Sequence, residues 1–172
     1  MDVVVRPAGE DDAAGIAGVH VASWKAAYAH ALPANLLAAL SVADRTAVWR
    51  RSLSAGMTVL VAEQGRQVVA FAAVGPSRDE DAAAGTVGEL LAIYADPAHW
   101  DAGIGARLHE QAIESLAESG FREAMLWVLD DNPRARRFYE RHGWAVDGAT
   151  KQAQVGDTTV AEVRYRRPLS PK

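Results

Sequence analysis

A loop with two glycines one residue apart, Gly103 and Gly105, separates a strand-like segment from a helical pattern. Glycines at such a junction let backbone N–H groups approach a ligand, and a helix N-terminus adds unpaired donors and a positive dipole. A dinucleotide fingerprint requires a third glycine where this chain has Leu108, and a Walker phosphate loop requires Gly-Lys-Ser/Thr where it has Gly-Ala-Arg. Two interpretations remain: a phosphate site of another kind at the start of the helix, or a tight turn without a ligand.

Three further side chains have types and spacing suited to acid–base chemistry. Glu89 interrupts an apolar strand pattern, so it is either a general base or the solvent-facing end of the strand. A water-relayed base is the alternative to Glu89 as the general base. Asn132 and Tyr139 lie seven residues apart on an expected helix, which puts both near one face. Asn132 suits the N-cap of that helix. Tyr139 is either a proton donor, since a phenol stays protonated at neutral pH, or a core aromatic beside Phe138.

The composition is that of a globular protein and excludes several classes of function. The 172 residues fit one domain, residues 1–172, and we expect the tail 169–172 to be disordered. A net charge of −4 argues against nucleic-acid binding. The absence of cysteine excludes disulfides, thiolate zinc sites and a cysteine nucleophile. No apolar run has membrane-spanning length and the N-terminus lacks a signal-peptide pattern, so we expect a cytoplasmic protein with no membrane partner.

The hydrophobic pattern predicts the elements that position these side chains. Strands are expected at 3–6, as a hairpin within 57–75, at 87–97, at 124–129 and twice within 144–167. Helices are expected at about 12–28, 34–40, 42–53, 103–118 and from Asn132 to Gly143. In the helix 103–118 one apolar stripe recurs every fourth residue, at Ile104, Leu108, Ala112 and Leu116. The order predicts a mixed α/β domain with a strand–helix–strand unit at its centre.

Three segments together resemble the GNAT superfamily of N-acetyltransferases: "ELLAIYADP", "WDAGIGARL" and "NPRARRFYERHGW". The family's loop follows Gln/Arg-x-x-Gly-x-Gly/Ala, and its later helix follows Asn-x-x-Ala-x-x-Phe-Tyr-x-x-x-Gly-Phe. The resemblance covers roughly residues 59–145. Trp100 stands in the slot for Gln/Arg, so the usual polar side chain is absent there, and Arg107 is a candidate to replace it. The later helix matches in register at Asn132, Ala135, Phe138, Tyr139 and Gly143, with Trp144 in place of the final Phe.

The resemblance implies a mixed α/β (α+β) fold, with a central twisted, mostly antiparallel sheet, a splayed fourth and fifth strand, and flanking helices. It implies acetyl-CoA as cosubstrate and transfer of its acetyl group, by direct attack in a ternary complex, to a primary amine of an unidentified small molecule or peptide. Ile93 N–H would donate to the thioester oxygen, Tyr139 would protonate the departing thiolate, and Glu89 is the candidate base. The cosubstrate-binding residues it implies are Ile93, Tyr94, Ala95, Trp100, Asp101, Ala102, Gly103, Ile104, Gly105, Ala106, Asn132 and Tyr139.

The residues that bind the acceptor amine are expected on the first helix. His20, Trp24 and Tyr28 recur every fourth residue and so share a face, which in the family lies over the acceptor site together with Glu89. The alternative is a packing face, which we favour for Trp24, and His20 is also a candidate to assist proton removal. The remaining histidines lack metal-ligand spacing, so no metal is expected.

Two other classes of protein compete with an enzyme. A non-catalytic acyl-CoA-sensing module would keep the same fold and cleft, but the joint presence of Glu89 and Tyr139 argues against it. A nucleotide-binding protein is disfavoured because the phosphate motifs are missing. A homodimer is expected because many relatives pair through the sheet or the C-terminal strands, and residues 144–167 offer strand edges that need cover.

Overall fold

A computed structural model describes residues 2–170 as one seven-stranded sheet flanked by helices. The strand order is β1-β2-β3-β4-β5-β7-β6. The strands are β1 (Val3–Pro7), β2 (Thr58–Gln64), β3 (Gln67–Pro76), β4 (Val87–Ala95), β5 (Glu123–Leu129), β6 (Ala145–Val155) and β7 (Thr158–Pro168). The helices are α1 (Ala13–Ala27), α2 (Ala34–Ala38), α3 (Val42–Ser54), α4 (Ile104–Glu118) and α5 (Pro133–Arg141). Two short 3-10 turns, η1 (Glu10–Asp12) and η2 (Pro97–His99), precede α1 and follow β4.

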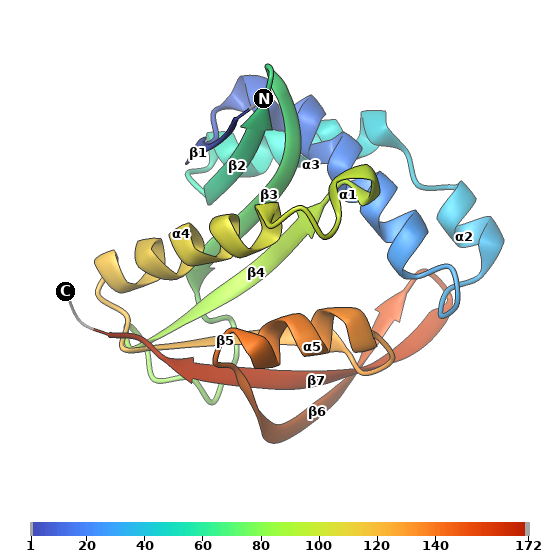
Figure 1. The fold of residues 1–172 in the computed structure, drawn as a ribbon. Helices are drawn as coiled ribbons and strands as arrows, with labels where there is room; N and C mark the ends of the chain where they lie inside the picture. The colour runs from blue at the N-terminus through green and yellow to red at the C-terminus, as the bar shows by residue number, and fades with distance from the viewer. Residues whose placement is uncertain (1, 171–172) are drawn as a thin grey trace.

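Helices cover both faces of the sheet (Figure 1). On one face α1 and α3 bury Ile16, Val19 and Trp49 against β2 and β3. On the other face α4 crosses β3 and β4 while α5 lies over β5 and β7. The expected apolar stripe of α4 is confirmed, since each of its members is buried in the core: Ile104, Leu108, Ala112 and Leu116. The strand β4, which borders the site, therefore packs against one hydrophobic cluster on each face of the sheet.

The sheet opens between β4 and β5, its only parallel pair among the described residues. The two strands pair only from Val87 to Glu89, opposite Glu123 to Met125, and then diverge (Figure 1). Gly88 allows the closed end to form, because a Cβ there would lie 2.7 Å from a Leu116 methyl group. The predicted fold class, with its splayed β4/β5 pair, is therefore confirmed.

The open stretch of β4 directs backbone groups into the gap. Asp96 N–H donates to Val69 C=O at 2.8 Å, which marks a hydrogen-bonded pair of the β3/β4 ladder. Because such pairs alternate along antiparallel strands, the N–H and C=O groups of Ile93 and Ala95 point away from β3, toward β5. These are the backbone groups that the resemblance assigns to cosubstrate binding.

Two boundaries differ from the expectations. β4 ends at Ala95 rather than at Pro97, because Asp96 caps the 3-10 turn by accepting a hydrogen bond from Ala98 N–H. The tail is ordered further than expected: Leu169 is only 5% exposed and its N–H donates to Arg122 C=O, so it belongs to the core. Residues 171 and 172 lie outside the described residues. None of the helices within residues 2–170 is both long and apolar enough to cross a membrane.

Candidate functional site

A cleft of about 890 Å³ fills the space where β4 and β5 diverge. Its walls come from β4, the glycine loop, α5, the end of α1 and the β6–β7 hairpin. Ala102, Ile104 and His20 are not among its lining residues; Ile104 instead lies in the core at 4% exposure. The structure thus brings together most of the expected site residues: Trp24, Tyr28, Glu89, Ile93, Tyr94, Ala95, Trp100, Asp101, Gly103, Gly105, Ala106, Asn132 and Tyr139.

The glycine loop leaves the start of α4 open. Gly103 is the N-cap with φ +77°, a left-handed conformation that favours glycine, and it supplies no side chain to cap the helix. The first turn of α4 contains no acidic residue. Gly105 lines the cleft, and a Cβ there would lie 3.7 Å from the Phe138 ring, so any larger side chain would narrow the space. Open N–H donors without a competing carboxylate in the helix suit an anionic group.

The aromatic residue at the start of this loop is fixed on both sides. The Trp100 indole N–H donates to Ala95 C=O at 2.9 Å, which uses one of the backbone groups that point into the gap. The Arg134 guanidinium of α5 lies 4.4 Å from the centre of the Trp100 ring. Arg107, the residue expected to supply a cation, is exposed and does not line the cleft. The cation near the loop therefore comes from α5, which the sequence alone did not indicate.

Tyr139 is both a core aromatic and a cleft residue. It is 9% exposed and belongs to the core beneath α4, while its side chain lines the cleft. Burial, followed by the neighbouring Tyr94, raises the pKa of the Tyr139 phenol above its usual value. Burial likewise raises the pKa of Tyr28 and of Tyr94, both of which line the same cleft. The cleft thus holds several phenols that keep their protons at neutral pH.

Asn132 is the N-cap of α5, as expected. Its Oδ1 accepts a hydrogen bond from Ala135 N–H at 3.2 Å, and Pro133 occupies the first helical position. Asn132 also lines the cleft, where its side chain is hydrogen-bonded to the Tyr28 phenol. Capping and cleft lining are therefore compatible, because the side-chain oxygen serves the helix while the amide NH₂ faces the phenol.

Glu89 lies at the apex of the cleft, at the last paired position of β4 and β5. Its side chain is 2% exposed, so the interpretation as a solvent-facing strand end is wrong. The carboxylate is paired with Arg78: Oε2 accepts from Nε at 3.1 Å and from the backbone N–H at 3.3 Å, and Oε1 accepts from Nη2 at 3.2 Å. The Arg78 side chain is 72% exposed. A buried carboxylate is thus neutralised by a cation that comes from the surface.

The face formed by His20, Trp24 and Tyr28 exists, but its members have different surroundings. Trp24 and Tyr28 meet edge to face at 5.0 Å and line the cleft. His20 lines a separate cavity of about 260 Å³, where Trp49 Nε1–H donates to its Nδ1 at 3.1 Å. Burial, with Arg45 nearby, lowers the pKa of His20 to about 4. Its Nδ1 is occupied as an acceptor, so His20 is poorly placed to take a proton from an acceptor in the cleft.

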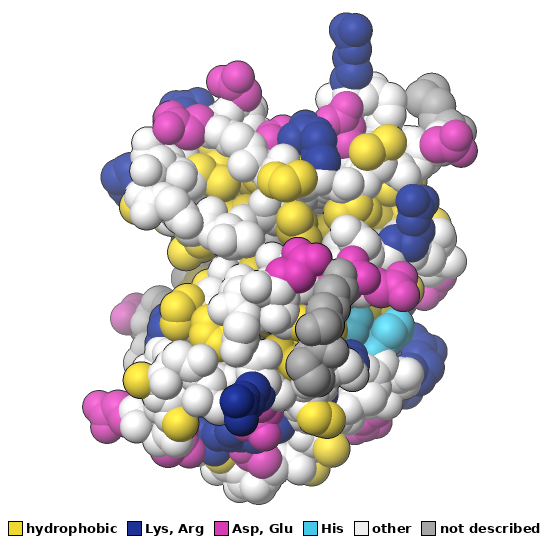
Figure 2. All heavy atoms as spheres, turned by 90° about the vertical axis from the view of Figure 1, so that its left-hand side faces the viewer, with side chains coloured by type: hydrophobic (Ala, Val, Ile, Leu, Met, Phe, Trp, Pro, Cys, Tyr) yellow, Lys and Arg dark blue, Asp and Glu magenta, His cyan; other side chains and the backbone are white. Residues whose placement is uncertain are grey.

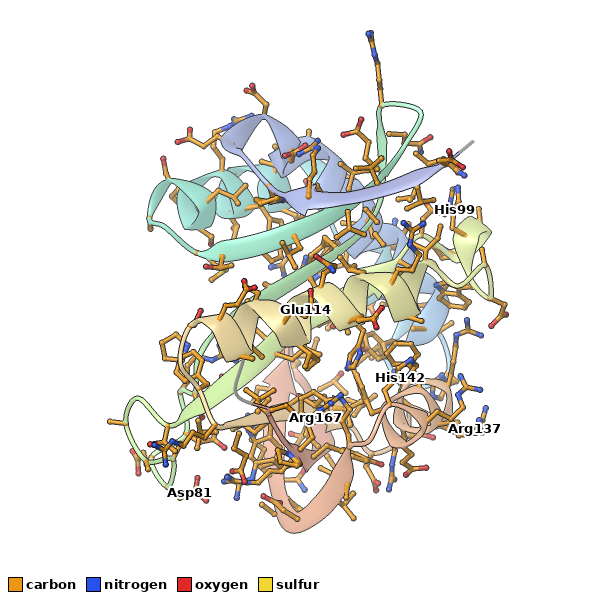
Figure 3. All side chains as sticks on the ribbon, turned by 60° about the vertical axis from the view of Figure 1, so that its left-hand side comes forward. Asp81, His99, Glu114, Arg137, His142 and Arg167 are labelled. Carbon is orange, nitrogen blue, oxygen red and sulfur yellow. The ribbon has the colours of Figure 1, made fainter. Side chains whose placement is uncertain are left out.

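Three acidic residues stand before β4, Asp79, Glu80 and Asp81, and two of them belong to a structural ion network that sequence reasoning missed. Asp79 accepts from Trp127 Nε1–H at 3.0 Å and pairs with Arg164 at 2.8 Å, and Asp81 pairs with Arg164 at 2.8 Å. Figure 3 places Asp81 on the loop far from Arg137, which extends outward from α5. Among the described residues on the face drawn in Figure 2, acidic and basic side chains are interspersed. Asp79 and Asp81 are therefore compensated by Arg164 rather than free to attract a cationic ligand.

Within residues 2–170 no group of three or more histidine or acidic side chains is arranged to hold a metal ion. His109 and His142 do approach each other, with ring centres 4.9 Å apart. His109 Nε2 accepts from the Trp144 indole N–H at 2.9 Å, and His142 Nδ1 lies 2.7 Å from Phe138 C=O. Figure 3 shows His142 in the layer between α4 and α5. These hydrogen bonds assign the two rings to packing between the helices.

Comparison with known proteins extends the resemblance beyond the motifs. The profile of the acetyltransferase (GNAT) family matches residues 19–144. YuaI of Bacillus subtilis, an uncharacterized N-acetyltransferase, is 35% identical over 131 residues, which are 76% of this chain and 74% of YuaI.

Solved structures share the fold. The PaiA N-acetyltransferase of Thermoplasma acidophilum, solved with coenzyme A, has a TM-score of 0.76 at 20% identity, covering 98% of this chain and 99% of that one. YncA of Salmonella typhimurium, a putative acetyltransferase solved with acetyl-CoA, has a TM-score of 0.73 at 21% identity, covering 100% and 96%.

Proposed function

The chain belongs to the acetyltransferase (GNAT) family, and from this premise we propose that it transfers the acetyl group of acetyl-CoA to a primary amine of a small molecule or peptide. The family and the enzyme class predicted from the motifs are thereby confirmed. The observation that carries the proposal is the cleft between β4 and β5, which joins an open helix N-terminus at one end to the buried Glu89 at its apex.

The residues of the cleft fit the cosubstrate. Gly103 and Gly105 leave room for a phosphate at the start of α4, and the backbone groups of Ile93 face the gap along which a pantetheine arm would lie. The amide of Asn132 lies on the opposite wall, beside the Tyr28 phenol. When bound, acetyl-CoA supplies a thioester carbonyl, the activated acyl group that the amine nitrogen attacks.

The reaction requires a hydrogen-bond donor, a proton acceptor and a proton donor from the protein. Ile93 N–H donates a hydrogen bond to the thioester oxygen as negative charge develops there. Glu89 accepts the proton that the amine loses as its nitrogen bonds to the acetyl carbon, directly or through a water molecule. Tyr139 donates its proton to the sulfur as the carbon–sulfur bond breaks, because a thiolate is costly to leave unprotonated in a partly apolar cleft.

Arg78 must leave Glu89 before the carboxylate can accept a proton. The pair is held by three contacts, but the Arg78 side chain is mostly exposed and can swing into water. A cationic ammonium group entering the apex would replace the guanidinium as partner of the carboxylate. Arg78 therefore keeps the buried charge neutralised until an amine arrives.

The test is thiol release from acetyl-CoA with a panel of amines, amino acids and peptides. An acetyltransferase gives amine-dependent release and an acetylated product by mass spectrometry. The rival, a non-catalytic acyl-CoA-sensing module of the same fold, binds acetyl-CoA by calorimetry but releases no thiol with any amine. Absence of acetyl-CoA binding contradicts both.

We also expect a homodimer, and a cytoplasmic location consistent with a chain that has no cysteine. β6 is the edge strand of the sheet, it pairs with β7, and its Val146 is 53% exposed. An unprotected edge of this length favours pairing with a second copy. Light scattering at working concentration tests the assembly, and a monomer mass contradicts it; fractionation of cells tests the location.

A further inference from the structure

The loop at the open end of the cleft carries a charge of the wrong sign for a phosphate. Within residues 100–106 the one charged side chain is Asp101, and Gly103 and Gly105 contribute only backbone. A carboxylate beside a phosphate is repulsive unless a cation compensates it. The Arg134 guanidinium does this, with Nη2 3.1 Å and Nη1 3.5 Å from the two Asp101 carboxylate oxygens.

A second contact fixes the same guanidinium in orientation. It lies 4.4 Å from the centre of the Trp100 ring, and the ring is itself tied to β4 by the hydrogen bond from its indole N–H to Ala95 C=O. The Arg134 side chain nevertheless remains 47% exposed. Because a guanidinium has five N–H donors and Asp101 engages two of its nitrogens, donors are left for a further anion.

The other cations near this end are not held in the same way. Arg137 and Arg141 also line the cleft and are exposed like Arg134, but no ion pair involves either of them among the described residues. Arg107 is exposed and does not line the cleft. Arg134 is therefore the cation whose position at the open end is set before any ligand binds.

We propose that Trp100 and Asp101 position Arg134 to bind the pyrophosphate of the cosubstrate, together with the N–H groups at the start of α4. This inference rests on the proposed function. It makes Arg134 a cosubstrate-binding residue and Trp100 a positioning residue that acts through it. A planar guanidinium stacked on an indole is a task that lysine cannot perform, so the pairing demands arginine.

The experiment measures affinity by calorimetry for acetyl-CoA and for acetyl-dephospho-CoA, which keeps the pyrophosphate but lacks the 3′-phosphate. Arg134→Gln is expected to weaken both ligands by about ten- to a hundredfold, the scale of a hydrogen bond to a charged group. Arg134→Lys should recover only part of this loss. Trp100→Leu should weaken binding in the wild-type background and have little further effect in Arg134→Gln, as coupled residues do. Arg137→Gln is the matched control, because it removes the same charge from the same wall of the cleft.

Three results would overturn the inference: wild-type affinity in a folded Arg134→Gln protein, an equal loss in Arg137→Gln, or a loss that vanishes with acetyl-dephospho-CoA. The first result would mean that Arg134 does not bind the cosubstrate. The second would mean that Arg134 contributes only through the net charge of the cleft. The third would mean that Arg134 contacts the 3′-phosphate and not the pyrophosphate. Failure of the proposed function looks different, since it appears in the wild-type protein, which would then bind neither ligand or would bind both and release no thiol with any amine. Thermal melting of each variant checks that the fold is intact.

Discussion

At the scale of single residues, the phenol of Tyr139 provides the sharpest test of the chemistry. Tyr139→Phe keeps the ring and its packing but removes the proton, so turnover should fall about ten- to a thousandfold while acetyl-CoA affinity stays unchanged. Single-turnover kinetics isolate this step. Because burial raises the pKa of Tyr139, the alkaline limb of the wild-type pH–rate profile should lie above about pH 10.

Tyr165 offers a matched control for that substitution. It is fully buried and its hydroxyl donates to Glu140 at 2.8 Å, but it does not line the cleft. Tyr165→Phe should therefore lower the melting temperature and leave the chemical step unchanged. A wild-type chemical step in Tyr139→Phe would make Tyr139 a packing residue alone.

Glu89 and its partner Arg78 form the second residue-scale test. Glu89→Gln should lower turnover with little effect on acetyl-CoA affinity and should change the acidic limb of the pH–rate profile. Arg78→Gln should lower the melting temperature, since it leaves the buried Glu89 carboxylate without its cation. An acidic limb that Glu89→Gln leaves in place would assign the base to a water molecule or another group.

Some of these residues were accessible to sequence reasoning and some were not, for a physical reason. Asn132 and Tyr139 belong to one helix, so their spacing alone puts them near one face. Glu89 stood out because a carboxylate interrupts an apolar strand. Arg78 and Arg134 gave no such signal, because their partners are 11 and 33 residues away in the chain. The conformation of two loops determines which cation reaches the carboxylate in each pair.

At the scale of elements, the junction of β4 and α4 determines what the cleft can bind. Gly105 is the better position to test, because Gly103 has φ +77° and any side chain there adds backbone strain. Gly105→Val places a branched side chain in the cleft and should weaken acetyl-CoA binding about tenfold or more, with Gly105→Ala intermediate. Calorimetry measures the loss.

A glycine elsewhere provides the control. Gly18 of α1 has open space where a Cβ would stand and lies outside the cleft, so Gly18→Val should leave acetyl-CoA affinity unchanged. If Gly105→Val also binds acetyl-CoA with wild-type affinity, the phosphates do not lie at the start of α4, and the loop is the tight turn without a ligand that remained as the alternative.

The elements themselves followed closely from the sequence. The stripe of α4, the hairpin around Gly65 and the caps of α5 each depend on residues within a few positions of one another. The strand boundary at Ala95 and the ordered Leu169 did not follow. The first depends on a side-chain cap in the following turn and the second on a contact with Arg122 C=O, a partner distant in the chain.

At the scale of the whole molecule, the two layers of helices bury groups that cannot easily be charged, and this predicts sensitivity to acid. His109, on the buried face of α4, is 2% exposed, and burial, with His142 and Arg167 nearby, lowers its pKa to about 3. On the other face, burial lowers the pKa of His20 to about 4. An unfolded histidine titrates near 6.5, so below this pH the unfolded state binds protons that the folded state excludes.

The sign of the effect follows directly. The stabilisation is complete above about pH 6.5 and is lost as the pH falls toward the folded-state values, so the free energy of unfolding should decrease on acidification. For His109 alone the loss of unfolding free energy between pH 7 and pH 5 is on the order of 2 kcal/mol.

His109→Gln keeps an acceptor for the Trp144 indole N–H but does not titrate, so the unfolding free energies measured by urea denaturation at the two pH values should differ less in this variant. An undiminished difference in His109→Gln would mean that the acid sensitivity arises elsewhere, in ion pairs such as that of Arg6 with Asp12, where hydrogen bonds from Arg6 lower the pKa of the carboxyl.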